Sequence, residues 1–96
     1  MRDYYDSVAA GDYQTSWAEL APEFQRGRAQ SYEYYTSFWD ENDIEIGDVR
    51  FVSAQGDEAL VDVDLRWNGR GEVQTDRFTL RRADDGSLLI ARQTTL

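Results

Sequence analysis

The segment EALVDVDLRW, residues 58–67, decides the fold that this sequence predicts. Apolar side chains occupy every second position, at Ala59, Val61, Val63, Leu65 and Trp67. Side chains of a β-strand alternate between the two faces of a sheet, so this pattern predicts a strand with one buried and one wet face. The dipeptide Gly56-Asp57 before the segment is a turn signal, and Gly69-Arg70-Gly71 after it is another. The segment is therefore predicted to lie inside an antiparallel sheet.

The same alternation predicts three more strands around this segment. Their inward residues are Ile44, Ile46, Val49 and Phe51 in the first strand, Phe78 and Leu80 in the third, and Leu88 and Ile90 in the fourth. The first set changes phase at Gly47, which is typical of a β-bulge. Residues 84–86, Asp-Asp-Gly, fit a three-residue hairpin loop with glycine in the left-handed position. Short turns between consecutive strands predict a four-stranded antiparallel meander.

Residues 1–43 follow a helical period and are rich in aromatic residues. Gly11 ends a first helix, Asp12 and Ser31 suit helix N-caps, and Pro22 suits the first turn of a helical segment. We therefore expect an α+β fold in which three N-terminal helical segments pack in the concavity of the curved sheet, giving a cone. The whole chain, residues 1–96, is predicted to be one domain.

Composition excludes several classes of function. The net charge of −9 argues against nucleic acid as a partner, because phosphate backbones reward basic patches. Cysteine and histidine are absent, which removes the thiol nucleophile, the usual general base and the commonest metal ligands. No apolar run is long enough for a membrane span, so we expect no direct membrane insertion of this segment.

No motif in the chain predicts a metal or a cofactor. Residues 40–43, Asp-Glu-Asn-Asp, are acidic, but they lack the alternating acids and following glycine of a calcium loop. A solvated helix end is the alternative interpretation of these acids. No glycine-rich phosphate loop and no nucleophile elbow are present. We therefore expect no metal site, no cofactor and no catalytic residue.

The predicted strand registers gather polar residues at one end of the inner face. A two-residue loop at Arg70-Gly71 would pair Trp67 with Gln74, Leu65 with Asp76 and Val63 with Phe78. A three-residue loop at residues 84–86 would pair Leu80 with Ile90 and Phe78 with Arg92, with Thr94 in phase. These pairings predict a ligand-binding site formed by Trp67, Gln74, Asp76, Arg92 and Thr94.

Within this predicted site, Asp76 and Arg92 are expected to form an ion pair, because a buried carboxylate needs a partner. The alternative is that the sheet curls away and leaves these residues in solvent. An apolar cavity is expected beside the site, and an ordinary filled core is the alternative. The side chains expected to line it are Trp17, Tyr35, Trp39, Trp67 and Phe78. The expected partner is a small apolar ligand or another protein.

The outward face of the sheet is expected to carry cross-strand charge pairs. Its acids Glu58, Asp62 and Asp64 face Arg66, Arg77 and Arg81. A partner-binding surface is the alternative interpretation of these charges.

Several segments of the chain resemble a small nuclear-transport-factor-2-like domain. They are Tyr4-Tyr5, Gly11-Asp12-Tyr13, Trp17-Ala18-Glu19-Leu20, Pro22-Glu23-Phe24-Gln25, Tyr35 with Phe38-Trp39, Gly56-Asp57-Glu58-Ala59 and Asp85-Gly86-Ser87-Leu88-Leu89-Ile90. More narrowly, they resemble the extracytoplasmic C-terminal domains of actinobacterial Ser/Thr protein kinases and related lipoproteins. The resemblance implies a sensor or ligand-binding module cut from a larger membrane-anchored protein, at the cell surface, with a cytoplasmic location left open. It also implies a homodimer through the convex face of the sheet, because relatives of this fold often dimerise there.

Three hypotheses about function follow. The first is a non-catalytic binding or sensing module, which could show a filled or ligand-holding cone. The second is an isomerase- or cyclase-like enzyme that uses Asp76 as a base, which should show an open pocket with an unpaired acid inside. The third is a structural dimerisation domain, which should show a filled cone and a broad apolar convex face. The fold alone does not decide among them.

Overall fold

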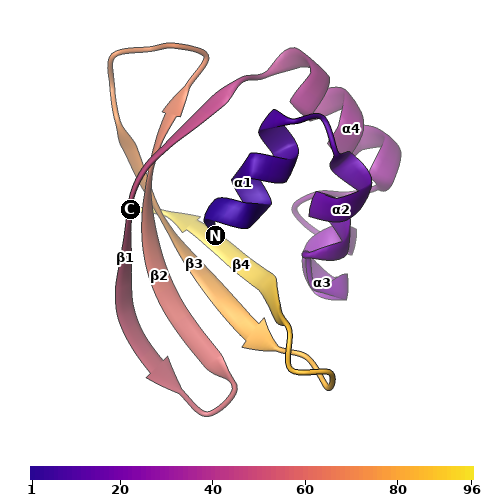
Figure 1. Cartoon of the computed structure of the whole chain (residues 1–96), viewed down its shortest axis with the longest axis vertical. Helices are drawn as coiled ribbons and strands as arrows, with labels where there is room; N and C mark the ends of the chain where they lie inside the picture. The colour runs from indigo at the N-terminus through magenta and orange to yellow at the C-terminus, as the bar shows by residue number, and fades with distance from the viewer.

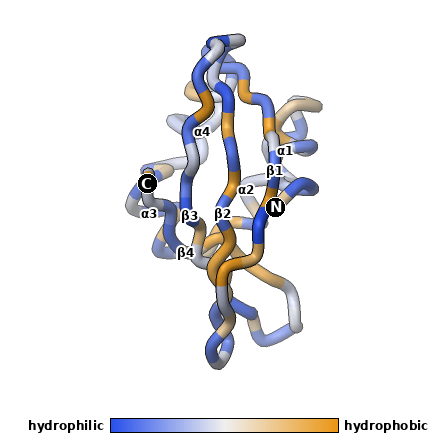
Figure 2. The backbone as a smooth tube through the Cα atoms, turned by 90° about the vertical axis from the view of Figure 1, so that its left-hand side faces the viewer, coloured by the Kyte–Doolittle hydropathy of each residue, from blue (hydrophilic) through white to orange (hydrophobic).

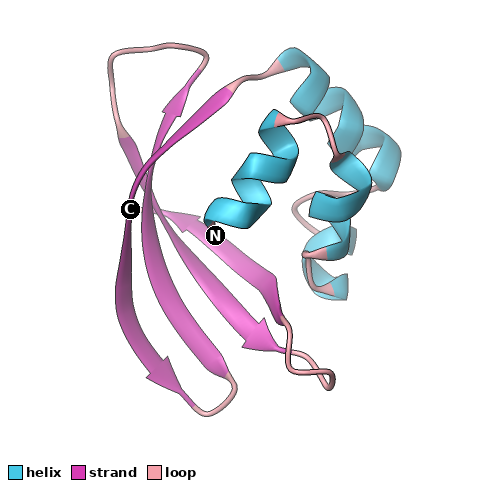
Figure 3. Cartoon of the chain, in the orientation of Figure 1, coloured by secondary structure: helices cyan, strands magenta, loops and turns pink.

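Four helices cover the concave face of a four-stranded sheet in this computed structural model, which describes residues 1–96 (Figures 1 and 3). The helices are α1 (Arg2–Ala9), α2 (Tyr13–Ala18), α3 (Pro22–Arg26) and α4 (Tyr32–Glu41). The strands are β1 (Ile44–Gln55), β2 (Glu58–Trp67), β3 (Gln74–Arg82) and β4 (Leu88–Thr95). The strand order is β1-β2-β3-β4, and every neighbouring pair is antiparallel. The predicted α+β meander is confirmed.

Local capping explains where the helices begin. The Asp12 carboxylate accepts a hydrogen bond from the Thr15 amide at 3.4 Å, and the Ser31 hydroxyl accepts one from the Tyr34 amide at 3.1 Å. Each bond satisfies an amide that has no partner within the first helical turn. Pro22 stands in the first turn of α3, where its missing N–H costs nothing. Both predicted caps are confirmed.

The structure contains four helices where we expected three helical segments. The chain leaves helical geometry between α2 and α3 because this stretch pairs with β4 instead. The Ala21 amide donates to the Ile90 carbonyl at 2.8 Å, and the Ile90 amide donates to the Glu19 carbonyl at 2.9 Å. These bonds cover the outer edge of β4, which would otherwise expose unpaired backbone groups.

The core lies between the helices and the inner face of the sheet. In β2, Val61, Val63 and Leu65 are 9%, 0% and 1% exposed, as the alternating pattern predicted. Figure 2 shows apolar and polar residues alternating along this strand. Phe78 of β3 is 1% exposed, and burying such a side chain contributes about 1.5–3 kcal/mol. The sheet therefore provides a hydrophobic floor on which the aromatic helices pack.

The pairing of β1 with β2 contains the predicted bulge. The register shifts between Ile46 and Val49, on either side of Gly47. A Cβ atom at Gly47 would lie 3.3 Å from Cβ of Asp64, which is tighter than ordinary contact. The bulge keeps Ile46 and Val49 on the same face, because the extra residue offsets the odd spacing between them.

The pairing of β2 with β3 differs from the predicted register by two residues. Val61 pairs with Phe78, and Leu65 pairs with Gln74, so the connecting loop spans residues 68–73. Asn68 belongs to this loop and not to β2, because its backbone is left-handed, with a φ of 52°. Its side chain accepts a hydrogen bond from the Asp43 amide at 2.7 Å. A shift of two residues leaves every side chain on its predicted face.

The pairing of β3 with β4 changes phase at a bulge that we did not predict. Leu80 pairs with Ile90 as expected, but Thr79 then pairs with Arg92, which leaves Ala91 without an opposite residue. Phe78 consequently faces Gln93. A shift of one residue moves each later side chain to the other face of a sheet. Gln93 therefore turns inward, whereas we had predicted Arg92 and Thr94 there.

Candidate functional site

A pocket of about 270 Å³ lies between the helices and the inner face of the sheet. It is lined by eleven residues, nine of them hydrophobic: Tyr4, Tyr5, Phe24, Arg28, Ala29, Tyr34, Tyr35, Phe38, Trp39, Trp67 and Gln93. Tyr35, Trp39 and Trp67, which we predicted as ligand-binding residues, are among them. Trp17 and Phe78, which we also predicted to line the cavity, do not: the Trp17 ring packs against Tyr35 at 5.2 Å, and Phe78 is 1% exposed in the core. The volume is just below the about 300–1,000 Å³ that is usual for small-molecule sites, so the pocket suits a small ligand.

Stacked aromatic rings form one wall of this pocket. The rings of Trp39 and Trp67 are stacked with centroids 5.6 Å apart and planes 6° apart. Phe38 packs edge-on against Trp67 at 5.8 Å, and Tyr5 packs edge-on against Trp39 at 6.4 Å. Offset and edge-to-face pairs of this kind contribute about 0.5–1.5 kcal/mol each beyond area burial. The wall is thus held by ring–ring contacts between α1, α4 and β2.

A chain of buried hydroxyls supports the tyrosines that line the pocket. The Tyr35 hydroxyl donates to Ser16 Oγ at 2.7 Å, and Ser16 Oγ donates to the Tyr13 carbonyl at 3.2 Å. Each hydroxyl has a single proton, so the 2.9 Å contact between the hydroxyls of Tyr4 and Tyr35 must have Tyr4 as its donor. Burial raises the pKa of Tyr4 well above its ordinary value, which keeps this donor protonated.

Asp76 is completely buried, and two amide side chains donate to it. Gln74 Nε2 lies 2.9 Å from Oδ1 of Asp76, and Gln93 Nε2 lies 2.5 Å from Oδ2. Asp76 is not among the pocket-lining residues, and Gln93 is. The carboxylate therefore fixes the orientation of a pocket side chain rather than facing a ligand itself.

The predicted ion pair between Asp76 and Arg92 is wrong. The Arg92 guanidinium bonds instead to Glu58 at 3.3 Å, with 65% of its side chain exposed. Thr94 is also exposed and pairs with Arg77 in the sheet. Both corrections follow from the Ala91 bulge. Gln74 shares the inner face with Asp76, as predicted, and donates to it, but it does not line the aromatic pocket.

Sequence reasoning missed Gln93, Tyr5 and Arg28 as pocket residues. In the C-terminal half of β4, odd and even positions are both polar, so alternation there could not show whether Gln93 or Arg92 faces inward. Tyr5 belonged to the predicted aromatic layer, but no pattern set it apart from the other rings. Arg28 follows Gly27 in a connecting segment, where periodicity gives no information.

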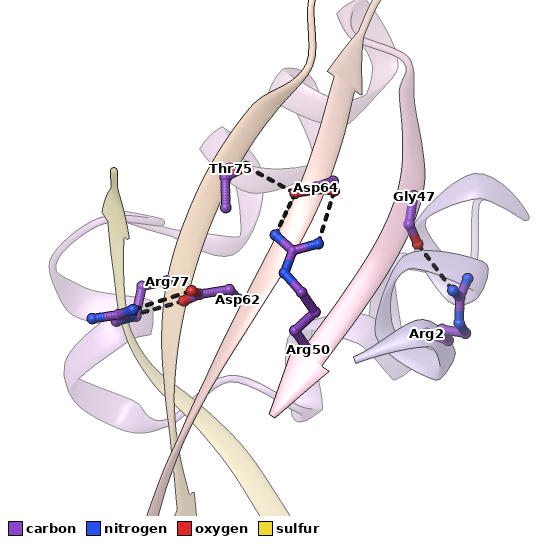
Figure 4. A network of polar contacts seen from close by, with 7 residues as sticks. All are labelled: Arg2, Gly47, Arg50, Asp62, Asp64, Thr75 and Arg77. Carbon is purple, nitrogen blue, oxygen red and sulfur yellow. Dashed lines mark hydrogen bonds and ion pairs between the residues drawn. The ribbon is translucent and has the colours of Figure 1, made fainter. Parts of the chain in front are cut away.

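The convex face of the sheet carries matched ion pairs (Figure 4). Arg77 bonds to Asp62 at 2.8 Å, and Arg50 bonds to Asp64 at 2.7 Å. The hydrogen bonds from Arg50 and Thr75 lower the pKa of Asp64 to about 2. Cross-strand charge pairing on this face is thus confirmed.

Two of the predicted cross-strand partners differ from the observed ones. Arg66 pairs with Glu45 of β1 at 3.3 Å, and Arg81 reaches Glu23 of α3 at 2.7 Å. Figure 4 also shows Arg2 donating to the Gly47 carbonyl, at 2.9 Å, which ties α1 to β1.

None of the helices has both the length and the apolar character that crossing a membrane requires.

Comparison with known proteins supports the fold and indicates a related sequence. No family model matches the chain. The structure is similar to that of an NTF2-like (nuclear transport factor 2-like) protein of unknown function from Cytophaga hutchinsonii ATCC 33406. The TM-score is 0.61 at 10% identity, over 97% of this chain and 83% of that one. The chain therefore has an NTF2-like fold.

The sequence is also 30% identical, over 88 residues, to the serine/threonine-protein kinase PknA of Nostoc sp. strain PCC 7120. The match covers 83% of this chain, but it spans only 16% of the length of that kinase. The sequence is thus similar to one short part of a kinase. The narrower resemblance to actinobacterial extracytoplasmic domains stays a prediction.

Proposed function

We propose that this chain is a non-catalytic sensor module that binds a small ligand in its aromatic pocket. The observation that carries the proposal is the pocket itself, a preformed space of about 270 Å³ with an aromatic wall and few polar lining groups. Small-molecule sites have this composition, because the apolar surface supplies affinity and a few polar atoms supply orientation. A filled cone would have favoured a purely structural role.

The burial and the hydrogen bonds of Asp76 support a non-catalytic role. A general base must reach the proton that it removes, yet Asp76 is 0% exposed and receives two amide hydrogen bonds. The isomerase-like alternative required an unpaired acid inside the pocket. With no histidine, cysteine or lysine in the chain, few groups remain for acid–base or nucleophilic chemistry.

The similarity to a short part of a Ser/Thr kinase supports a regulatory setting. We propose that the module belongs to a membrane-anchored kinase or similar signalling protein and lies outside the cytoplasm. There, ligand binding could be communicated to a catalytic domain on the other side of the membrane. Such coupling requires the ligand to bind two states of the protein with different affinity.

Self-association through the convex face stays a prediction. That face carries matched charges rather than the broad apolar area that we expected of a structural dimerisation domain. Surface ion pairs that are already satisfied within one chain give a second copy little to gain. The pocket is therefore the better basis for a function.

A fluorescence and melting screen tests the pocket proposal. Trp67 forms the pocket wall, so a bound ligand should change its emission and raise the melting temperature. Trp67→Ala should abolish the response to hits from a small-molecule library. Phe51→Ala is the matched control, because it also truncates an aromatic side chain to alanine, and Phe51 is 69% exposed and does not line the pocket. The proposal fails if no compound binds, or if hits bind equally well to the Trp67→Ala variant.

A further inference from the structure

The hydroxyl of Tyr5 is free to bond to a ligand. Tyr5 is only 4% exposed and lines the pocket, yet its hydroxyl makes no hydrogen bond within the chain. The one fully buried side-chain polar atom without a partner is Oε2 of Glu19, so the Tyr5 hydroxyl keeps an accessible surface. Because Tyr5 lines the pocket, the space open to its hydroxyl is the pocket. Burial raises the pKa of Tyr5, so the group is a protonated phenol that can donate.

Gln93 offers a hydrogen-bond acceptor to the same pocket. Its Nε2 is engaged by Asp76 at 2.5 Å, and its Oε1 accepts no hydrogen bond within the chain. A carboxylate oxygen accepts hydrogen bonds, so Asp76 fixes which end of the amide faces it. Glu19 Oε2 is the only buried side-chain polar atom without a partner, so Gln93 Oε1, which also has no partner, must keep some accessible surface. The pocket thus has one amide acceptor and one phenol among its lining residues.

Arg28 is the only charged residue that lines the pocket. Its guanidinium forms no ion pair and no hydrogen bond within the chain, although the sequence contains nineteen acidic residues. Arg28 is exposed, so it lies at the mouth of the pocket, whereas Asp76 is buried behind Gln93. Both charges act on the Tyr5 hydroxyl, since Asp76 raises its pKa and Arg28 lowers it. The pocket therefore has a cation at its mouth, and a buried carboxylate lies behind Gln93 at its inner end.

We propose that the ligand is a small amphipathic carboxylic acid, with its carboxylate on Arg28 and its apolar body against Trp39 and Trp67. A guanidinium binds a carboxylate through two parallel N–H bonds. Asp76 repels an anion from the base of the pocket, so the carboxylate stays at the mouth and the apolar body points inward. A polar group on that body would meet Tyr5 and Gln93. A single guanidinium matches one negative charge, which favours a carboxylate over a phosphate ester.

This inference rests on the proposed function and names the ligand class for the same pocket. Its test uses three probes of one shape: phenylbutyrate, the alcohol phenylbutanol and the amine phenylbutylamine. NMR titration of the isotope-labelled protein follows the Trp67 indole N–H signal and gives a Kd for each probe. Phenylbutyrate should bind most tightly and the amine most weakly. Arg28→Gln should weaken phenylbutyrate binding about tenfold and leave phenylbutanol unchanged.

The matched control is Arg26→Gln, which removes the same charge from an exposed residue that does not line the pocket. This variant should leave all three affinities unchanged. Equal binding of the acid and the alcohol, or equal losses in both arginine variants, would overturn the carboxylate assignment while the pocket proposal stands. If none of the probes binds, the carboxylate assignment fails, and a negative library screen would extend the failure to the pocket. Because Arg28 has no partner in the chain, its replacement is not expected to disturb folding.

Discussion

Replacing Tyr35 by phenylalanine should destabilise the protein more than the same change at Tyr4. In the hydroxyl chain that supports the pocket, the Tyr35 hydroxyl accepts a hydrogen bond from Tyr4 at 2.9 Å and donates one to Ser16 at 2.7 Å. Tyr35→Phe removes both bonds and leaves the Tyr4 donor without an acceptor. Tyr4→Phe removes one bond and leaves Tyr35 donating to Ser16. Only Tyr35→Phe therefore leaves a buried hydrogen-bond donor, the Tyr4 hydroxyl, without an acceptor.

The expected magnitudes follow from the cost of single hydrogen bonds. A buried hydrogen bond contributes about 1 kcal/mol net, and a stranded buried donor costs about 1–3 kcal/mol. We therefore expect Tyr4→Phe to lower the free energy of unfolding by about 1 kcal/mol and Tyr35→Phe by about 2–3 kcal/mol. The double variant should cost no more than Tyr35→Phe alone, because it removes the stranded donor as well.

Urea unfolding followed by circular dichroism at neutral pH measures these differences. A domain of this size has a stability of about 5–14 kcal/mol, so shifts of 1–3 kcal/mol are well resolved. Tyr32→Phe is the control: Tyr32 is 41% exposed and its hydroxyl has no partner, so less than about 0.5 kcal/mol should be lost. Equal costs at Tyr4 and Tyr35, or strictly additive costs in the double variant, would refute the direction assigned to the hydroxyl chain.

Three further substitutions test other polar groups. Burial and the nearby Asp3 charge raise the pKa of Glu19, so its carboxylate destabilises the fold as pH rises through that raised pKa. Glu19→Gln should therefore raise the melting temperature at pH 7 and change it little at about pH 4; the reverse pattern in calorimetry would contradict this sign. Gln93→Leu should cost about 1–3 kcal/mol in urea unfolding, because Asp76 loses a buried donor. Arg92→Leu should cost less than about 0.5 kcal/mol, since Arg92 is paired only at the surface; comparable losses in both variants would argue against the observed register.

Local signals in the sequence were enough to predict most of the architecture. Alternation along residues 58–67 identified β2 and its buried face, and the phase change at Gly47 identified the bulge in β1. Asp12 and Ser31 marked the starts of α2 and α4. These features depend on residues that are close in the chain, so their physical causes act before any tertiary contact forms.

The candidate site was predictable only in part. Tyr35, Trp39 and Trp67 were assigned to a cavity because large rings on a helical stripe and on a strand face must meet between the two layers. Arg28 gave no such signal, because it stands in a loop whose path depends on how the helices pack. The hydroxyl chain was equally hidden, since it joins residues up to thirty-one positions apart.

The sequence by itself determined the strands, the helix caps and the negative charge, because each depends on local chemistry or composition. Only the tertiary structure decided the length of the loop between β2 and β3 and the register of β4. A regular ladder would place the Arg92 guanidinium opposite Phe78 in the core, whereas the Ala91 bulge places the neutral amide of Gln93 there and releases Arg92 to Glu58. Burying a charge costs far more than burying an amide that finds a partner. That difference depends on where Asp76 and solvent lie in the folded molecule, and no local pattern contains this information.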